Sequence, residues 1–247
     1  MWGALGDTFA VAMALALSPI ALTTALVLLL GERGRRRALL FAGGWYLCVF
    51  VVTAVAMWVT DTADEEDPAA TADGIDILHL VFAVVFFVLA LVTWIKRPSA
   101  RASAKGADGL PPGTQLLETE VLGEDEPGKP GLFERVDHLG SAACFALGFA
   151  QGILIIKNIP LAISAGMRFG AAELPQAEAL VLVAIFAGLA SLGTLIPLVA
   201  YVVGGERVDH SLRDARRWIE AHMTAITLVI LVVVGGVFLG EGLGLAD

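Results

Sequence analysis

The chain has 247 residues, of which 57% are hydrophobic, with a formal net charge of -9 and a mean hydropathy of +0.79. Its apolar residues form long blocks rather than the alternating pattern of a half-buried strand or an amphipathic helix, which excludes an ordinary soluble domain. We therefore predict an all-α polytopic membrane protein.

Six apolar blocks are long enough to cross the hydrocarbon core of a bilayer, which requires about 20 helical residues. They are Leu5 to Leu30, Ala38 to Thr60, Ile75 to Ile95, Leu139 to Met167, Ala177 to Val203 and Trp218 to Leu239. No Lys or Arg precedes the first block, and its apolar run is longer than that of a typical signal peptide. We therefore expect the first block to remain as a transmembrane helix.

The basic residues predict the orientation of the spans. Fourteen of the 16 lie in three segments, which follow the first, third and fifth blocks. Because Lys and Arg accumulate in cytoplasmic loops, this distribution predicts that both termini lie outside and that the long loop after the third block is cytoplasmic. We expect a multi-pass protein of the inner (plasma) membrane. The remaining two basic residues are Arg168 and Lys157.

Residues 98–135 divide the six blocks into two sets of three. This segment is rich in Gly, Pro, Ser, Lys and Glu, a composition that is typical of a linker. An odd number of spans in each half inverts the second half in the membrane. The predicted architecture is therefore two inverted three-helix repeats, residues 1–97 and 136–247, joined by a cytoplasmic linker.

Prolines interrupt the first span of each half. Pro19 follows Ser18 in the first block, and Pro160 stands two residues after Asn158 in the fourth. Corresponding interruptions in two halves are the best sequence indication of a transporter site at the repeat interface. Pro197 in the fifth block predicts a third helix break, which is either a gating hinge or an accident of packing.

Two further segments carry structural predictions. Gly43 and Gly44, beside an aromatic pair in the second block, would let another helix approach closely. The segment from Glu206 to His222 is predicted to be an amphipathic interfacial helix that continues into the sixth block. Cys48 and Cys144 have no CxxC spacing, so we expect small buried side chains rather than a metal site.

Lys157 is the residue around which a site is predicted. A lysine at the centre of a helix in lipid costs about 2.5 to 3.5 kcal/mol, so Lys157 should face protein, water or an anionic ligand. Polar residues in the same two spans complete the predicted substrate-binding set, which is Lys157, Asn158, Gln151, Ser18, Thr23, Thr24 and Ser164. Two simpler readings stay open: Lys157 snorkels to the headgroups, and the hydroxyls only bond the backbone.

Sequence signals of catalysis or cofactor binding are absent. The chain has no phosphate loop, no dinucleotide glycine pattern, no HExxH and no nucleophile elbow, so we expect neither an enzyme nor a bound cofactor or metal. The spans also lack the paired Asp or Glu on which many cation antiporters depend. The acidic run in residues 61–76 predicts a solvated loop, with a weak divalent-cation site as the alternative.

Nearly the whole chain resembles the sulfolipid-addressing and glycopeptidolipid-addressing (GAP) membrane proteins of actinobacteria, which are similar to the LysE-type exporter superfamily. The motifs that carry the resemblance are Ala16-Leu-Ser-Pro-Ile20, Leu147-Gly-Phe149, Lys157-Asn158 and Ile163-Ser-Ala-Gly166. The resemblance implies two inverted three-helix repeats and the export of lipid-linked or glycolipid material to the cell envelope.

From these observations we predict a transporter of an envelope lipid or glycolipid with an anionic or glycosylated headgroup. The alternatives are a LysE-type exporter of a small soluble metabolite, such as an amino acid, and a non-transporting scaffold for lipid-synthesis enzymes. The expected partners are the lipid substrate and lipid-synthesis or envelope-export proteins, with no nucleic acid. A homo-oligomer is compatible with the sequence.

Overall fold

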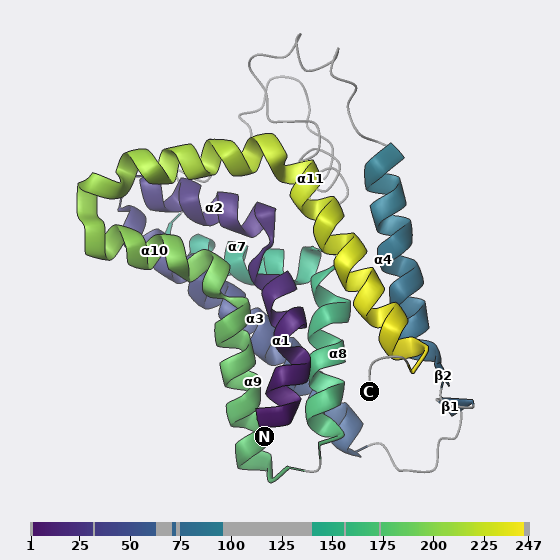
Figure 1. Ribbon diagram of the computed structural model, residues 1–247. Helices are drawn as coiled ribbons and strands as arrows, with labels where there is room; N and C mark the ends of the chain where they lie inside the picture. The colour runs from purple at the N-terminus through teal and green to yellow at the C-terminus, as the bar shows by residue number, and fades with distance from the viewer. Residues whose placement is uncertain are drawn as a thin grey trace.

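A computed structural model describes residues 2–31, 33–62, 71–72, 75–95, 140–155, 157–172 and 174–244. Almost all of them are helical (Figure 1). The elements are α1 (Trp2–Ala16), α2 (Pro19–Leu30), α3 (Gly34–Thr62), β1 (Thr71–Ala72), β2 (Ile75–Asp76), α4 (Ile77–Ile95), α7 (Ser141–Leu154), α8 (Asn158–Gly170), α9 (Gln176–Ala190), α10 (Leu192–Gly204), the 3-10 helix η3 (Gly205–Val208) and α11 (Asp209–Gly242). The strands β1 and β2 form one short antiparallel pair, with Thr71 opposite Asp76. The predicted linker and most of the acidic loop lie outside the described residues.

Within these ranges the structure has up to five apolar spans. The helices α3 and α11 are each long and apolar enough to cross a membrane alone. Three bent pairs qualify when each is taken as one broken span: α1 with α2, α7 with α8, and α9 with α10. The remaining apolar helix is α4, of which the segment Leu80–Ile95 is apolar but shorter than a full span. The helical class is confirmed, and the sixth full span stays a prediction.

The bends lie at three short breaks. The angle between α1 and α2 is 56°, that between α7 and α8 is 79°, and that between α9 and α10 is 64°. Pro19 is the first residue of α2, where its missing N–H is not needed and its fixed φ suits helix entry. Pro160 is the third residue of α8, so it too lies in a first turn, and the break precedes it.

The third break differs from the prediction. Pro197 lies inside α10, and the fifth span bends at Ser191, six residues earlier. A proline leaves the carbonyl four residues before it without its donor, so the disturbance falls toward the N-terminal side of the ring. The predicted break at Pro197 is therefore corrected to Ser191.

Small residues hold α7 and α8 against α3. A Cβ atom added to Gly44 of α3 would overlap the carbonyl oxygen of Phe145, and one added to Gly148 of α7 would overlap that of Phe41. Further along α3, Gly166 and Gly170 of α8 also lie too close to its backbone to accept a side chain without a shift. The close approach predicted from Gly44 is confirmed, and glycine is needed because any side chain would separate the helices.

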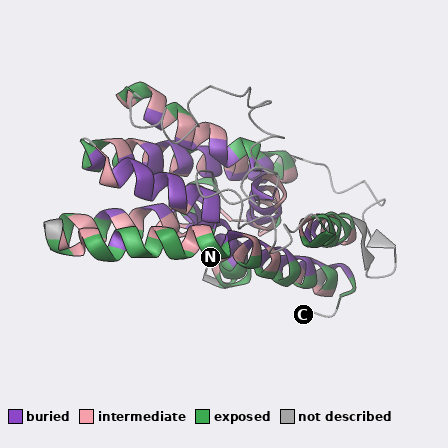
Figure 2. Ribbon diagram, turned by 90° about the horizontal axis from the view of Figure 1, so that it is seen from above, coloured by how far each residue is buried: buried purple, intermediate pink, exposed green. Residues whose placement is uncertain are grey.

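Buried side chains concentrate where these helices meet, and exposed ones cover the outer faces (Figure 2). The helix α4 packs mainly on α11, beside which it runs in Figure 1. Phe86 of α4 stacks on Phe238 of α11 with their ring centroids 5.6 Å apart. The opposite side of α4 exposes Val84 and Val88, as expected of a helix that faces acyl chains.

Candidate functional site

The break between α1 and α2 leaves backbone carbonyls without amide donors. The amide of Leu17 donates to the carbonyl oxygen of Met13 at 2.9 Å, and Pro19 has no N–H to offer the carbonyl of Leu15. The carbonyl oxygen of Ala14 accepts a hydrogen bond from Nζ of Lys157 at 3.1 Å instead. A cation at a helix C-terminus is favoured by the helix dipole, so Lys157 serves as a cap for α1.

Lys157 lies in the second break, between α7 and α8, and is only 6% exposed. Its ammonium also donates to Oδ1 of Asn158 at 3.3 Å, while Nδ2 of Asn158 donates to the carbonyl oxygen of Gly152 at 3.4 Å. Because the ammonium can only donate, it fixes which end of the Asn158 amide faces it. The two side chains together satisfy carbonyls at the ends of α1 and α7.

Gln151 and Thr24 form a second polar link between the two broken spans. The hydroxyl of Thr24 donates to the carbonyl oxygen of Ile20 at 2.9 Å, so its single proton is used. Nε2 of Gln151 donates to Oγ1 of Thr24 at 3.0 Å. This chain of donors orients the Gln151 amide and leaves its Oε1 buried without a partner in the described part of the protein.

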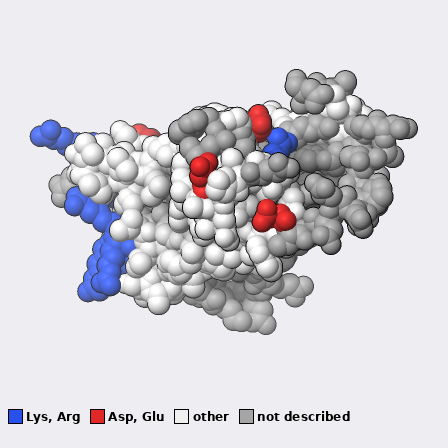
Figure 3. Space-filling view, turned by 90° about the horizontal axis from the view of Figure 1, so that it is seen from below, with Lys and Arg blue, Asp and Glu red and all other residues white. Residues whose placement is uncertain are grey.

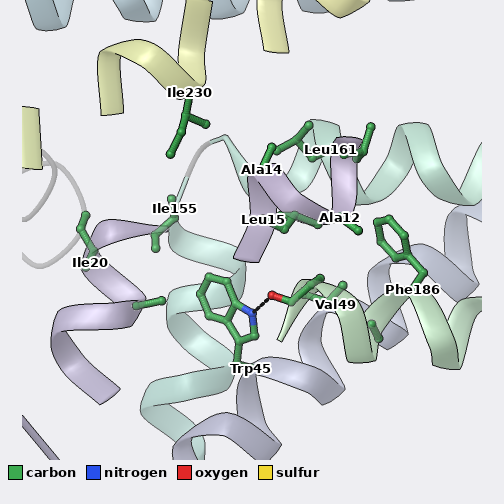
Figure 4. Close-up of a cluster of buried hydrophobic side chains, with 14 of the residues drawn as sticks. Ala12, Ala14, Leu15, Ile20, Trp45, Val49, Ile155, Leu161, Phe186 and Ile230 are labelled. Atoms are coloured by element: carbon green, nitrogen blue, oxygen red, sulfur yellow. Dashed lines mark hydrogen bonds between the residues drawn. The ribbon is translucent and has the colours of Figure 1, made fainter. Parts of the chain in front are cut away.

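The third break belongs to the same junction, although the sequence reasoning did not place it there. Nε1 of Trp45 in α3 donates to the carbonyl oxygen of Ala190, the last residue of α9, at 3.4 Å. Figure 4 shows this bond beneath Ile155, with Ala14 and Leu15 of α1 nearby. A Cβ atom on Gly193 would overlap the carbonyl oxygen of Ala16, so the start of α10 rests on the end of α1.

A common principle explains all three breaks. In a bilayer no water is available for the carbonyls at a helix end, so a broken span is stable only when other protein groups satisfy them. Lys157, Asn158 and Trp45 provide that satisfaction for α1, α7 and α9 respectively. No local pattern around Trp45 predicts this role, because its partner is 145 residues away in the chain.

A family model described as "Sap, sulfolipid-1-addressing protein" matches residues 9–244, which is nearly the whole chain. The chain belongs to the Sap family. The resemblance to sulfolipid-addressing proteins is confirmed, whereas the relation to LysE-type exporters stays a prediction. No curated protein and no solved structure matches the chain.

Three of the predicted site residues in this Sap-family protein have buried hydroxyls without a hydrogen-bond partner in the described structure. They are Ser18 at the first break, Thr23 in α2 and Ser164 in α8. Thr53 of α3 shares this property, and sequence analysis missed it because a lone threonine in an apolar helix usually bonds its own backbone. An unpaired buried hydroxyl is energetically costly and is uncommon in a folded protein.

The structure brings four of the predicted residues into direct contact. Lys157 contacts Asn158, and Gln151 contacts Thr24. Ser18, Thr23 and Ser164 are buried in the same spans, but no hydrogen bond joins them to those four. In the described residues no salt bridge involves Lys157, and no group of three His, Cys, Asp or Glu residues could hold a metal. Cys48 and Cys144 are buried, as predicted.

The Sap-family junction therefore places a lysine and several hydrogen-bonding groups inside an apolar protein. An ammonium has three N–H donors, and the contacts of Lys157 to Ala14 and Asn158 use two. The Oε1 atom of Gln151 and the hydroxyls of Ser18, Thr23 and Ser164 have no hydrogen-bond partner in the described structure.

Proposed function

We propose that this membrane protein exports an envelope lipid or glycolipid with an anionic or glycosylated headgroup, and that Lys157 and Asn158 contact that headgroup. The observation that carries the proposal is the buried ammonium of Lys157, whose partners among the described residues are a carbonyl and an amide oxygen rather than a carboxylate. A buried cation without a protein counter-ion favours an anionic ligand.

The broken helices strengthen the preference for an anion. The helix α2 begins at Pro19 and α8 begins at Asn158, each next to a break. Neither N-terminus has a side-chain cap, although Pro19 and Pro160 have no N–H and the amide of Asn158 donates to the carbonyl oxygen of Ile155 at 2.8 Å, so each end offers fewer free amides than an ordinary helix start. Helix N-termini at a break carry partial positive charge, and transporters use them to bind anionic substrate groups.

The contacts between helices support two inverted repeats. In two inverted repeats, α1 and α2 would correspond to α7 and α8, and α3 would correspond to α9 and α10. The packing of α3 on α7 and α8 would then correspond to the packing of α9 and α10 on α1 and α2, and both contacts are present. The helices α4 and α11 would correspond to each other, and they are in contact. The halves also differ, since α3 is continuous where its counterpart bends, and α11 packs on α2 whereas α4 makes no comparable contact with α8 in the described residues. Rocking of one repeat against the other would give alternating access.

The proposed orientation follows the distribution of basic residues. Both termini would lie outside the inner membrane, and residues 98–135 would lie in the cytoplasm. The proposal includes no catalytic step and no cofactor. Lipid-synthesis or envelope-export proteins are the expected partners on the two sides.

The decisive experiment compares surface and total lipids of a deletion strain. The strain is complemented with the wild-type protein, with Lys157→Met, or with Trp58→Phe as a control at an exposed position. We expect one lipid to disappear from the surface and accumulate inside in the deletion strain. The wild type and the control should restore it, and a folded, membrane-inserted Lys157→Met variant should not.

Two other outcomes would reject parts of the proposal. Unchanged surface lipids in the deletion strain would exclude lipid export and favour the export of a small soluble metabolite. A scaffold would lose function when residues 98–135 are removed, whereas a transporter should tolerate that deletion. Full export by Lys157→Met would show that the headgroup does not bind at this junction.

A further inference from the structure

Arginines gather at one end of the molecule, where α10 passes through η3 into α11 (Figure 3). We call this surface the basic end. It consists of two groups from opposite halves of the chain, which are Arg33, Arg35, Arg36 and Arg37 around the start of α3, and Arg207, Arg213, Arg216 and Arg217 on η3 and α11.

A cation-π contact joins the first group to the end of α10, which leads into the second group. Cζ of Arg35 lies 5.3 Å from the ring centroid of Tyr201, which is in the last turn of α10. The helix α11 also packs on α2, the helix that leads into the first group. Residues about 170 positions apart in sequence thus form one surface, and this proximity is a property of the fold alone.

The charge of the basic end is only partly neutralised. Three arginines of α11 pair with acidic residues on the same helix, at 2.7 Å for Arg216 with Glu220, 3.6 Å for Arg213 with Asp209 and 3.8 Å for Arg217 with Asp214. The pairs of Arg213 and Arg217 are largely exposed, and such pairs are weak and leave the arginine available to a stronger partner, whereas the Arg216–Glu220 pair is half-buried. Arg33, Arg36 and Arg207 are exposed and make no salt bridge to any described residue.

Arg33 occupies a backbone conformation that disfavours it. Its φ is 56°, in the left-handed region where the Cβ atom of a non-glycine residue is crowded by the backbone. Glycine would be less strained at this position in the turn between α2 and α3. An exposed arginine at a strained position indicates a role for its charge rather than for its backbone.

The first part of α11 has the form of an interfacial helix. Leu212 is buried, whereas Arg213 and Arg217 are exposed, so the two faces differ in polarity. Trp218 is 58% exposed and stacks on His222 with their ring centroids 4.8 Å apart. Aromatic and basic residues together mark the headgroup level of a bilayer. In Figure 1 this part of α11 runs across the molecule before the helix turns toward its C-terminus.

We propose that the basic end binds the phosphate groups of anionic phospholipids in the membrane leaflet that it faces. The guanidinium group matches phosphate oxygens in a planar, two-bond geometry, and the exposed arginines are numerous enough to hold more than one headgroup. This surface is separate from the buried junction around Lys157 and does not depend on what the protein transports.

The test uses the full-length protein reconstituted in bilayers that contain phosphatidylglycerol and phosphatidylcholine. Spin-labelled analogues of the two lipids report which of them is enriched in the motionally restricted shell around the protein. We expect phosphatidylglycerol to be preferred, and the preference to fall steeply as sodium chloride is raised. An equal distribution of the two lipids, or a preference that salt does not change, would overturn the proposal.

Two matched variants identify the surface. Arg33→Gly removes one charge and also the backbone strain, so it should be at least as stable as the wild type and yet lose about fivefold in preference, the effect expected for one arginine near an anionic surface. Asp214→Asn removes a neighbour of Arg217 and should raise the preference. No loss in Arg33→Gly together with no gain in Asp214→Asn would exclude the basic end as the lipid-binding surface.

Discussion

Nζ of Lys157 and the carbonyl oxygen of Ala14 lie 3.1 Å apart, although 143 residues separate them in the chain. This hydrogen bond joins the break in the fourth span to the break in the first. It gives the buried ammonium a structural role as a cap, and it also leaves one of its donors for a ligand. The two roles share one side chain, so variants of its neighbours are needed to separate them.

Asn158→Asp should abolish lipid export and should also lower the stability of the protein, because a carboxylate cannot donate to the carbonyl oxygen of Gly152 as Nδ2 of Asn158 does at 3.4 Å. The change replaces the amide beside Lys157 with a carboxylate, and the amide oxygen lies 3.3 Å from the ammonium. An internal counter-ion would then compete with the headgroup for the cation. Surface lipid analysis measures export, and thermal stability in detergent measures folding. Wild-type export by this variant would show that the charge of Lys157 is not used for binding.

Thr24→Val and Gln151→Leu should each destabilise the protein by about 1 to 3 kcal/mol, the usual cost of a buried polar group that loses its partner. Nε2 of Gln151 donates to Thr24 at 3.0 Å, so the double variant should lose less than the sum of the two. The free energy of unfolding in dodecyl sulfate measures this coupling. Additive losses would mean that the two side chains do not interact.

Trp45→Phe should loosen the bend of the fifth span. The change keeps an aromatic ring but removes the donor to the carbonyl oxygen of Ala190, which lies 3.4 Å away. We expect hydrogen exchange of amides near Ser191 to accelerate by about tenfold, which corresponds to the roughly 1.4 kcal/mol of a lost buried hydrogen bond. Trp58→Phe is the control, because Trp58 is exposed on the same helix. Equal exchange in the two variants would contradict a capping role for Trp45.

Gly148→Ala should destabilise the protein by about 1 to 3 kcal/mol through overpacking. A methyl group at Gly148 would overlap the carbonyl oxygen of Phe41 and push α7 away from α3. Gly188→Ala in α9 is the matched control, since nothing lies within 4 Å of the added atom. The control should be neutral or stabilising because alanine favours a helix. Thermal unfolding in detergent distinguishes the two, and similar midpoints would rule out the close packing.

The sequence by itself determined the class of the protein and the regions of interest. Long apolar blocks require membrane helices because the hydrophobic effect and the lack of water in lipid act on every residue locally. Lys157 and Pro19 could be singled out for the same reason, since a charge or a missing amide within such a block is costly wherever the block packs.

The tertiary structure alone decided which groups meet. The donors for the freed carbonyls of Ala14 and Ala190 come from distant segments, from Lys157 and Trp45, and hydropathy carries no information about those pairings. The third break lies at Ser191 rather than at the predicted Pro197, and the nearby Gly193 packs against the end of α1. A helix can break in a membrane only where neighbours satisfy its exposed carbonyls, so the position of a break depends on the neighbours as much as on the proline.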